Sequence, residues 1–372
     1  FKGSARERRE ADAMMRDEAF WKKYRAVELS KSESSMSQFV HRVEQMKGFK
    51  YVIFGLKALI ENFVETGGKD HPSKVDIGPI NTIFTRNFID GFRTRISAQT
   101  TANLSKHWFL AGYMARGWGS KKNYYSGELT YSFNKKEYLP REFPKRTMSF
   151  KSTYDIMSPS DKFLRTDKDN VFTSLKWTKV DKMMFYNRQQ LTFEREEEWG
   201  MKTTLSLRTE ENEAVGALFF EKLSNPFPSI IYPETDVSKL LHNGKMRTTE
   251  LRFELEIAPG RTFINTKQRR IAINLEAPVI TLSHSMGLNG VLGGQYRYNF
   301  SEVGLLKRFW LRSWGKFDVQ LHAGAQWDKV PFPLLIMPAA NLSYIVQRGT
   351  FNLINNMEFL NDRYASVDLG WD

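Results

Sequence analysis

The chain of 372 residues contains no cysteine. This absence excludes disulfide bonds, thiolate metal sites and cysteine nucleophiles. The six histidines form no metal motif, because no two have the i, i+4 spacing of a helical site and no HExxH sequence occurs. They are His41, His71, His107, His242, His284 and His322. We therefore expect no metal site and no cofactor.

The motifs of common enzyme classes are also missing. No P-loop and no GxSxG sequence occur. Ser313-Trp314-Gly315-Lys316 fits the SxxK pattern, but no Lys-Thr-Gly sequence accompanies it. In Ser283-His284-Ser285, neighbouring strand residues point to opposite faces, so the imidazole cannot serve either serine as a base. No catalytic residue is nominated, and we expect the chain not to be an enzyme.

No apolar run approaches the ~18 residues that a transmembrane helix needs. The best stretch, residues 51–64, is interrupted by Lys57 and Glu61. A mean hydropathy of −0.49 does not exclude a membrane barrel, because only alternate strand residues of a barrel meet lipid. Aromatic residues make up 14% of the chain, and Tyr and Trp favour membrane interfaces.

Apolar and polar residues alternate over stretches of about ten residues, which is typical of amphipathic β-strands. Within 92–99, apolar or small residues occupy every second position, and 124–133, 251–257 and 317–326 repeat the pattern. Each such strand has one apolar and one polar face. In a barrel the polar face would line the lumen, and the candidate lumen-facing residues are Arg93, Arg95, Glu128, Arg252 and Gln320.

Thirteen strands are predicted after Lys74. Their approximate ranges are 77–85, 91–101, 107–117, 123–134, 146–158, 170–178, 184–198, 201–209, 246–258, 277–287, 294–309, 315–327 and 362–371. Two connections are long, 210–245 and 328–361, which is common on the extracellular side of outer-membrane barrels and rare in compact soluble domains. The predicted fold is an all-β, antiparallel transmembrane barrel over residues 74–372.

We predict that residues 1–73 form a charged, helical segment before the barrel. Helices are predicted over 11–29, 36–46 and 49–63, and Gly67-Gly68 with Pro72 ends the helical pattern. The last helix either packs on the rim of its own domain or lies on a membrane surface.

The sequence begins at Phe1 without an initiator methionine and stops at Asp372 within an alternating strand. We interpret it as an internal stretch of a longer protein. Because bacterial barrels mostly close with an even number of strands, we expect the barrel to be incomplete in this stretch and to close with strands beyond Asp372.

The formal net charge of +13 suggests an anionic partner. The basic residues are spread through turns and are not gathered on one stripe, which argues against nucleic acid. We expect contacts with outer-membrane lipid and lipopolysaccharide at the barrel rims, and contacts with other envelope proteins are a further expectation.

Several stretches resemble an uncharacterised outer-membrane barrel family of Bacteroidota, a domain of unknown function that often follows a carboxypeptidase-regulatory-like domain. The stretches that carry the resemblance are Asp17–Arg25, Asp76–Pro79, Asp90–Arg93, Gly287–Gly294, Lys307–Phe309, Val330–Leu335 and Glu358–Ser366. The resemblance runs over nearly the whole chain, and the last two stretches are the most specific. The family implies an outer-membrane location and supplies no catalytic residues.

This family is distantly similar to the BamA and TamA barrels that insert proteins into the outer membrane. Those barrels carry an Arg-Gly motif on a long loop that folds back into the lumen. Here Arg348-Gly349 lies in the long connection after the twelfth predicted strand, but Thr350 replaces the aromatic residue that usually follows the glycine.

We therefore expect an integral outer-membrane barrel with a non-enzymatic envelope role. That role is either the assembly or export of outer-membrane or surface proteins, or a channel. One alternative is a soluble or surface-tethered all-β binding module. A second is a membrane-embedded barrel hydrolase, which would need a Ser or Asp beside a His at the barrel mouth.

Overall fold

The computed structural model describes residues 20, 23, 55, 58, 60–68, 71–163, 170–218, 220, 245–345, 347 and 349–371. The chain divides into two units, Phe1–Lys57 and Ala58–Asp372. In the first unit the three described residues, Phe20, Lys23 and Gly55, are helical. The helices predicted over 11–29 and 36–46 otherwise lie outside the described residues, as does most of the helix predicted over 49–63.

The second unit is built around one antiparallel sheet, with fourteen strands in the described part of the chain. Its strands are β1 (Val64–Glu65), β2 (Val75–Ile77), β3 (Phe84–Asn87), β4 (Gly91–Thr100), β5 (Trp108–Gly117), β6 (Asn123–Ser132), β7 (Arg146–Met157), β8 (Lys182–Glu196), β9 (Met201–Gly216), β10 (Lys245–Ile257), β13 (Val279–Gly287), β14 (Tyr298–Trp310), β15 (Lys316–Gln326) and β16 (Arg363–Trp371). From β4 onward each strand pairs with the next one in this list, and β2 and β3 share the outer edge of β4.

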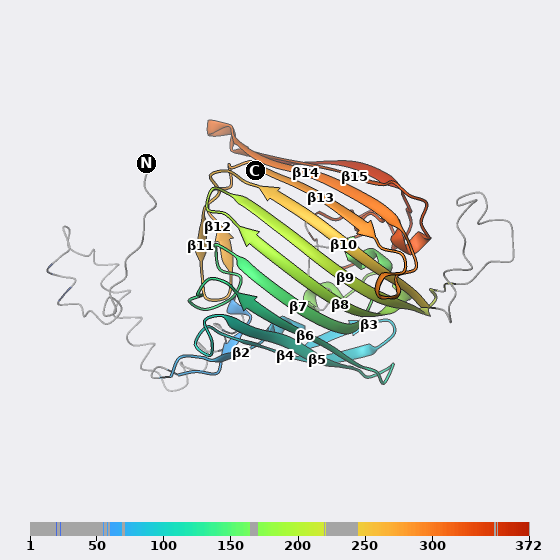
Figure 1. The fold of residues 1–372 in the computed structure, drawn as a ribbon, viewed down its shortest axis with the longest axis horizontal. Coiled ribbons are helices and arrows are strands. Elements are labelled where there is room, and N and C mark those ends of the chain that lie inside the picture. The colour runs from blue at the N-terminus through green and yellow to red at the C-terminus, as the bar shows by residue number, and fades with distance from the viewer. Residues whose placement is uncertain are drawn as a thin grey trace. The chain divides into compact units, whose positions relative to one another are not determined.

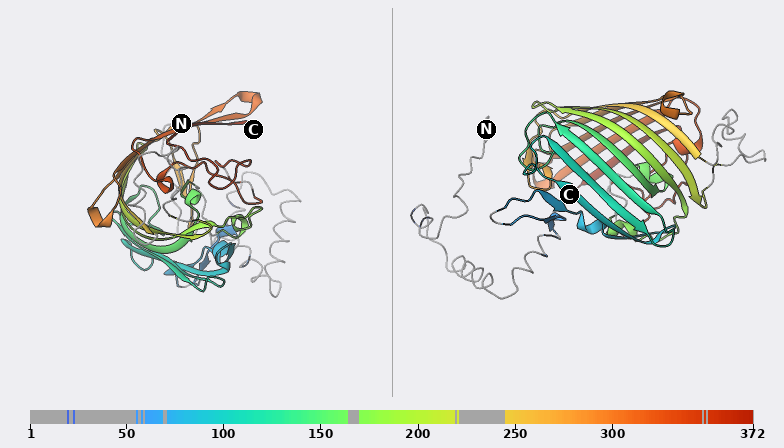
Figure 2. Two further views of the ribbon diagram at one scale, coloured as in Figure 1. Left: turned by 90° about the vertical axis from the view of Figure 1, so that its right-hand side faces the viewer. Right: turned by 60° about the horizontal axis from the view of Figure 1, so that its bottom comes forward.

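The sheet curls about an interior space, so that its first strands and its last strands lie on opposite sides of that space (Figure 1; Figure 2). We call the end where β2 pairs with Thr100 of β4 the entry end, and the opposite end the far end. Connections at the entry end include 101–107, 133–145 and 258–278, and connections at the far end include 158–181, 217–244 and 327–362.

The two faces of the sheet have the reverse of the polarity found in soluble proteins, where the interior is apolar and the surface polar. On β4, Arg93 is 0% exposed on the inner face, whereas Ile96 is 75% exposed on the outer face. Met114, directly opposite Ile96 on β5, is also 75% exposed. Inner-face residues with little exposure include Ser97, Ser126, Thr130, Thr153, Asp155, Ser206, Glu210, Asn212 and Ser285. Polar side chains are therefore buried inside the curve, and apolar side chains cover the outside.

The prediction of an all-β antiparallel fold is confirmed. Eleven of the thirteen predicted strands correspond to β4–β10 and β13–β16 within a few residues. Closure into a barrel is not shown, because in the described residues no ladder joins β16 to β1, β2, β3 or β4. Within the same residues, no helix has the length and apolar character required to span a membrane.

Two predicted strands are wrong or imprecise. The stretch 170–178 contains a short helix, α4 (Val171–Ser174), because the Asn170 side chain caps it by accepting a hydrogen bond from the Phe172 N–H at 3.0 Å. The stretch 77–85 covers parts of β2 and β3, which are separated by a 3₁₀ turn at Ile80–Thr82.

The structure also contains strands that the sequence pattern missed. A separate hairpin, β11 (Phe263–Asn265) with β12 (Arg270–Ala272), lies in the connection between β10 and β13. Strand β9 extends to Gly216, so the long connection predicted to start at residue 210 starts later. The pair β1–β2 places Val64 in the sheet, ahead of the predicted domain boundary at 73/74.

Candidate functional site

The polar inner face is held together by side chains that reach across several strands. Arg93 on β4 donates two hydrogen bonds to Asp155 on β7, at 2.6 and 3.0 Å. Tyr113 on β5 also donates to Asp155, and Asp90 lies 3.7 Å from the Arg93 guanidinium. The contacts of Arg93 and Tyr113 with Asp155 bridge non-adjacent strands, which a strongly curved sheet permits, whereas Asp90 is a local partner from the turn before β4.

The other candidate lumen-facing residues lie on the same face. Arg95 donates to Ser97 at 2.9 Å and stacks on the Tyr113 ring. Glu128 on β6 pairs with Lys151 on β7 at 3.4 Å, and both side chains are partly exposed.

Arg252 occupies a different sector of the inner face. Its guanidinium lies 3.3 Å from Glu302 on β14 and donates to Ser283 on β13 at 2.9 Å. Gln320 on β15 lies on this face opposite Asp368 of β16. The five candidate residues therefore share one polar face, but no contact joins Arg93 to Arg252 or Gln320 in the described part of the chain. They do not form one compact site.

Residues 327–362, which we call the inner segment, fold back against the inner face near the far end. Phe332, Leu334 and Met357 pack on a buried cluster of strand side chains. That cluster comprises Met157, Met184, Tyr186 and Met246 from β7, β8 and β10, with Leu218 and Phe220. The inner segment is thus a packed part of the interior, with hydrophobic contacts to three strands.

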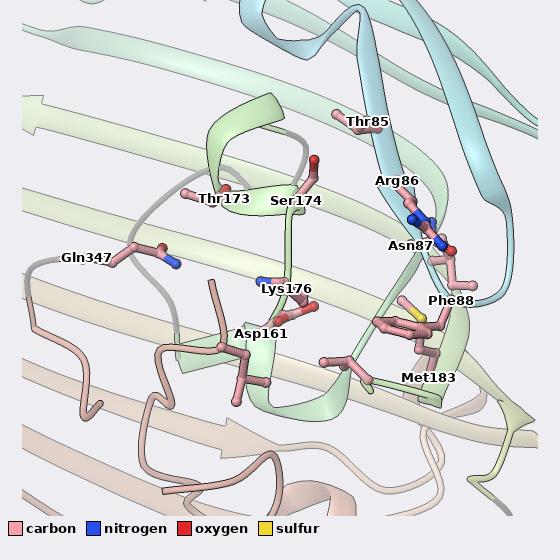
Figure 3. A pocket seen from close by; sticks show the side chains of 13 residues that line it. Thr85, Arg86, Asn87, Phe88, Asp161, Thr173, Ser174, Lys176, Met183 and Gln347 are labelled. Atoms are coloured by element: carbon pink, nitrogen blue, oxygen red, sulfur yellow. The ribbon is translucent and has the colours of Figure 1, made fainter. Parts of the chain in front are cut away.

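Polar contacts join the inner segment to residues 158–181. Asn356 accepts a hydrogen bond from Ser160 at 2.5 Å and donates one to Ser158 at 3.0 Å. Trp177 donates its indole N–H to the Asn341 carbonyl at 3.2 Å. Figure 3 shows the seam between these segments and the sheet wall, where Thr85, Lys176 and Gln347 surround a cavity of about 50 Å³. A space of this size suits one or two water molecules and no larger ligand.

Charged residues tie the 3₁₀ turn at Pro159–Phe163 to the sheet. Lys162 of this turn lies 3.3 Å from Glu210 on β9, which also pairs with Arg188 on β8 at 2.5 Å. Burial lowers the pKa of Lys162, and Glu210 opposes that shift. Glu210 is the buried member that both cations share, so its removal would leave Lys162 and Arg188 without this carboxylate and would destabilise the fold.

The Arg-Gly motif lies within the inner segment, as its place in the sequence suggested. Arg348 itself lies outside the described residues. Gly349 is exposed in a turn with φ of 72°, and Thr350 closes the turn by donating to the Gln347 carbonyl at 2.6 Å. A role for this motif like that of the Arg-Gly motif in the assembly barrels stays a prediction.

The β11–β12 hairpin, which we call the capping hairpin (residues 263–272), crosses the entry end of the sheet (Figure 1). Gln268 at its tip is 4% exposed and donates to Asp76 on β2 at 2.7 Å. It also accepts a hydrogen bond from Gln99 on β4 at 2.8 Å. A hairpin that leaves the sheet between β10 and β13 is thereby fastened to the opposite side of the interior.

Loop 133–145 packs beside the capping hairpin. The rings of Phe143 and Phe263 are in tilted contact with centroids 5.4 Å apart, and the Arg270 guanidinium lies over both rings. Lys136 in this loop is buried and donates to the carbonyls of Glu142 and Pro144 at 2.7 and 2.8 Å. Burial lowers the pKa of Lys136 to about 8.

The outer face brings together one pair that the sequence could not reveal. His284 on β13 lies with its Nδ1 2.8 Å from the Ser301 hydroxyl on β14, and Trp327 donates to the same hydroxyl at 2.9 Å. A nucleophile and base need a third group to orient the imidazole. None contacts the other nitrogen of His284 in the described residues. In the same residues, no group of three or more metal-ligating side chains occurs.

The residues that the sequence analysis missed are Asp155, Asn356, Gln268 and Ser301. Asp155 lies on the polar stripe of a predicted strand, so alternation alone could have found it. The other three depend on strand register or on loop packing, which local sequence does not specify.

Comparison with known families gives one match. The family described as Family of unknown function (DUF5686) C-terminal domain matches residues 63–365. Among curated proteins, no significant match is found.

The hydrogen bonds of Asn356 are expected to hold the inner segment against residues 158–181, so their loss should favour its release. Asn356→Ala removes two hydrogen bonds to buried serines, each loss costing about 1 kcal/mol or more. We expect limited proteolysis within residues 327–362 to become roughly tenfold faster, because the undocked state is more populated. Among the described residues, the side chain of the neighbouring Asn355 bonds to Glu358 of the inner segment itself, so Asn355→Ala is the matched control. Equal cleavage rates for the two variants would contradict the docking.

Proposed function

Because the chain belongs to the family of unknown function DUF5686, we propose its function from the structure itself: it forms the wall of an integral outer-membrane β-barrel that serves the assembly or export of outer-membrane or surface proteins. The observation that carries this proposal is the reversed polarity of the sheet. An apolar outer face and a polar inner face are the arrangement that a barrel in lipid requires.

The distribution of apolar and aromatic residues on the outer face supports a membrane location. At mid-strand it carries Ile96, Met114, Leu129, Phe150, Leu282, Val303 and Val367, all exposed. Exposed aromatic residues lie near both ends of the strands. They are Trp108, Phe133, Trp199, Trp310, Trp314 and Trp371 at the entry end, and Phe88, Phe92, Trp118 and Trp327 at the far end. An apolar band between aromatic girdles matches the hydrocarbon core and interfaces of a bilayer, whereas soluble proteins rarely expose so large an apolar surface.

The orientation follows from the lengths of the connections. Outer-membrane barrels have short periplasmic turns and longer extracellular loops. The longest connections, 217–244 and 327–362, both leave the far end. The far end would therefore face the cell exterior and the entry end the periplasm.

Assembly or export is favoured over a constitutive channel by the contents of the interior. The inner segment packs inside the far end, and the capping hairpin crosses the entry end. The outer edge of β4 is covered by two short strands, β2 and β3, of three and four residues, and backbone hydrogen bonds join Arg95 to Ile83 and Gly78 to Ser97 between them. Two short strands are displaced from an edge more readily than one long strand, so this edge of the sheet can exchange strand partners.

A pair of adjacent substitutions tests the membrane location. Leu321 lies at the middle of β15 on the outer face, between Leu305 and Val367, whereas Gln320 lies on the inner face. An arginine that faces lipid at mid-depth costs ~2–4 kcal/mol. We therefore expect Leu321→Arg to lower the yield of detergent-extracted protein with heat-modifiable gel migration, and Gln320→Arg to leave it nearly unchanged. A wild-type chain that is extracted without detergent would instead support the soluble binding module.

Depletion tests the envelope role. In a bacterium that carries the gene, we expect depletion to reduce the abundance of several outer-membrane or surface proteins, measured by quantitative proteomics of the membrane fraction. A complementing gene that encodes Gln320→Arg should restore them, and one that encodes Leu321→Arg should not. Loss of the uptake of one small solute, with an unchanged surface proteome, would indicate a channel and contradict the assembly role.

A further inference from the structure

A basic cavity of about 500 Å³, open to solvent, lies at the entry end and is lined in part by the capping hairpin. Six cationic side chains line it: Arg141, Lys145, Lys202, Arg261, Arg269 and Arg270. Only two carboxylates, Glu196 and Glu256, share the lining. We propose that this cavity is a binding site for a phosphate-bearing ligand.

The cations converge from three separate parts of the chain. Arg141 and Lys145 come from the connection before β7, and Lys202 stands at the start of β9. Arg261 follows β10, and Arg269 with Arg270 belongs to the capping hairpin. Charges brought together from three segments around one cavity differ from a solvated run of lysines on a single surface strand.

The neighbouring carboxylates neutralise only part of this charge. Arg270 pairs with Glu196 at 2.7 Å, and Arg261 pairs with Glu256 at 3.1 Å. Lys145 and Lys202 share a third carboxylate, Glu194. Three carboxylates therefore face six cations, and the cavity keeps an excess of positive charge.

Two of the arginines form no ion pair with a carboxylate in the described residues. Arg141 donates at 2.8 Å to the neutral amide oxygen of Gln99. The Arg269 guanidinium has no carboxylate within ion-pair distance among the described residues, and its backbone N–H bonds to Thr266. Both guanidiniums can therefore bind an incoming anion without breaking an existing ion pair.

The cavity is preorganised by its neighbours. Arg270 is fixed between Glu196 and the rings of Phe143 and Phe263. Gln268, next to Arg269, is buried and bonded on both sides, which fixes the hairpin tip. Fixed donors bind an anion with little loss of conformational entropy.

The size and geometry favour a compact phosphorylated group. Ligand sites commonly measure ~300–1,000 Å³, so the cavity admits a small molecule or a lipid headgroup. A tetrahedral phosphate presents oxygens in several directions and accepts guanidinium forks from different sides, whereas a carboxylate accepts mainly in one plane. The anion site does not depend on the proposed function, although its placement on the periplasmic side does.

Calorimetry on the purified full chain in an uncharged detergent tests the site at low salt. The probes are inorganic pyrophosphate, dihexanoylphosphatidic acid below its micelle concentration, and citrate as a carboxylate. We expect at least one phosphorylated probe to bind with 1:1 stoichiometry and more tightly than citrate. The tighter of the two phosphorylated probes identifies the source as a free phosphate compound or a lipid headgroup.

The double variant Arg141→Gln/Arg269→Gln should weaken this binding about tenfold or more, since each lost charge-assisted contact is a strong one. Arg141→Lys/Arg269→Lys should retain part of the affinity because it keeps the charge and loses only the fork. Arg363→Gln, at an exposed position on the far end, is the matched control and should leave the dissociation constant within about twofold. Heat-modifiable gel migration verifies that each variant is folded. The proposal is overturned if neither phosphorylated probe binds, if citrate binds as tightly, or if Arg363→Gln costs as much as the double variant.

Discussion

The charged side chains of the inner face have to find their partners inside the curve of the sheet, and the rest of the structure depends on this constraint. Arg93 is fully buried and is compensated by Asp155, which lies three strands away along the sheet. A flat sheet would separate these groups by roughly 14 Å, given a strand spacing of about 4.8 Å. Curvature brings them within hydrogen-bonding distance, and each such contact in turn favours the curved form. An isolated buried charge would cost far more than the pair contributes, so these residues specify the shape of the sheet.

The same constraint explains why the interior is filled from both ends. Polar strands alone would leave a wide, hydrated space, but the inner segment supplies Phe332, Leu334 and Met357 to an apolar cluster at the far end. At the entry end the capping hairpin crosses to Asp76 and Gln99 through Gln268. Both closures rest on a few specific side-chain hydrogen bonds together with hydrophobic or aromatic contacts. Elements held in this way can open without unfolding the strands. Such opening is compatible with a barrel whose interior is closed at rest and opens when it handles a substrate.

Strand positions were the part of the fold that the sequence predicted best, because alternation with a period of two is a local property. It located β4 and β15 and placed Arg93, Arg252 and Gln320 on one polar face. It failed at residues 170–178, where the side chain of Asn170 caps a helix and overrides a β-favourable composition. It also missed the capping hairpin, whose strands are only three residues long and are fixed by contacts to distant strands.

The candidate sites were harder to predict than the strands. The basic cavity joins residues from position 141 to position 271, and the pair His284–Ser301 depends on the register of β13 against β14. Local sequence does not specify either. The inner segment was predicted only as a long connection, since its packing against β7, β8 and β10 becomes visible only when the sheet is folded.

The absence of cysteine makes the central claim, that the apolar outer face contacts lipid, directly measurable with single spin labels. Phe150 and Lys151 are neighbours near the middle of β7, are about half exposed, and lie on the outer and inner faces respectively. After reconstitution into bilayers, a label at position 150 should be relaxed by oxygen and protected from a water-soluble nickel complex, as expected for a residue in the hydrocarbon core. A label at position 151 should show less oxygen contact. Ready access of the nickel complex to position 150 would contradict the account.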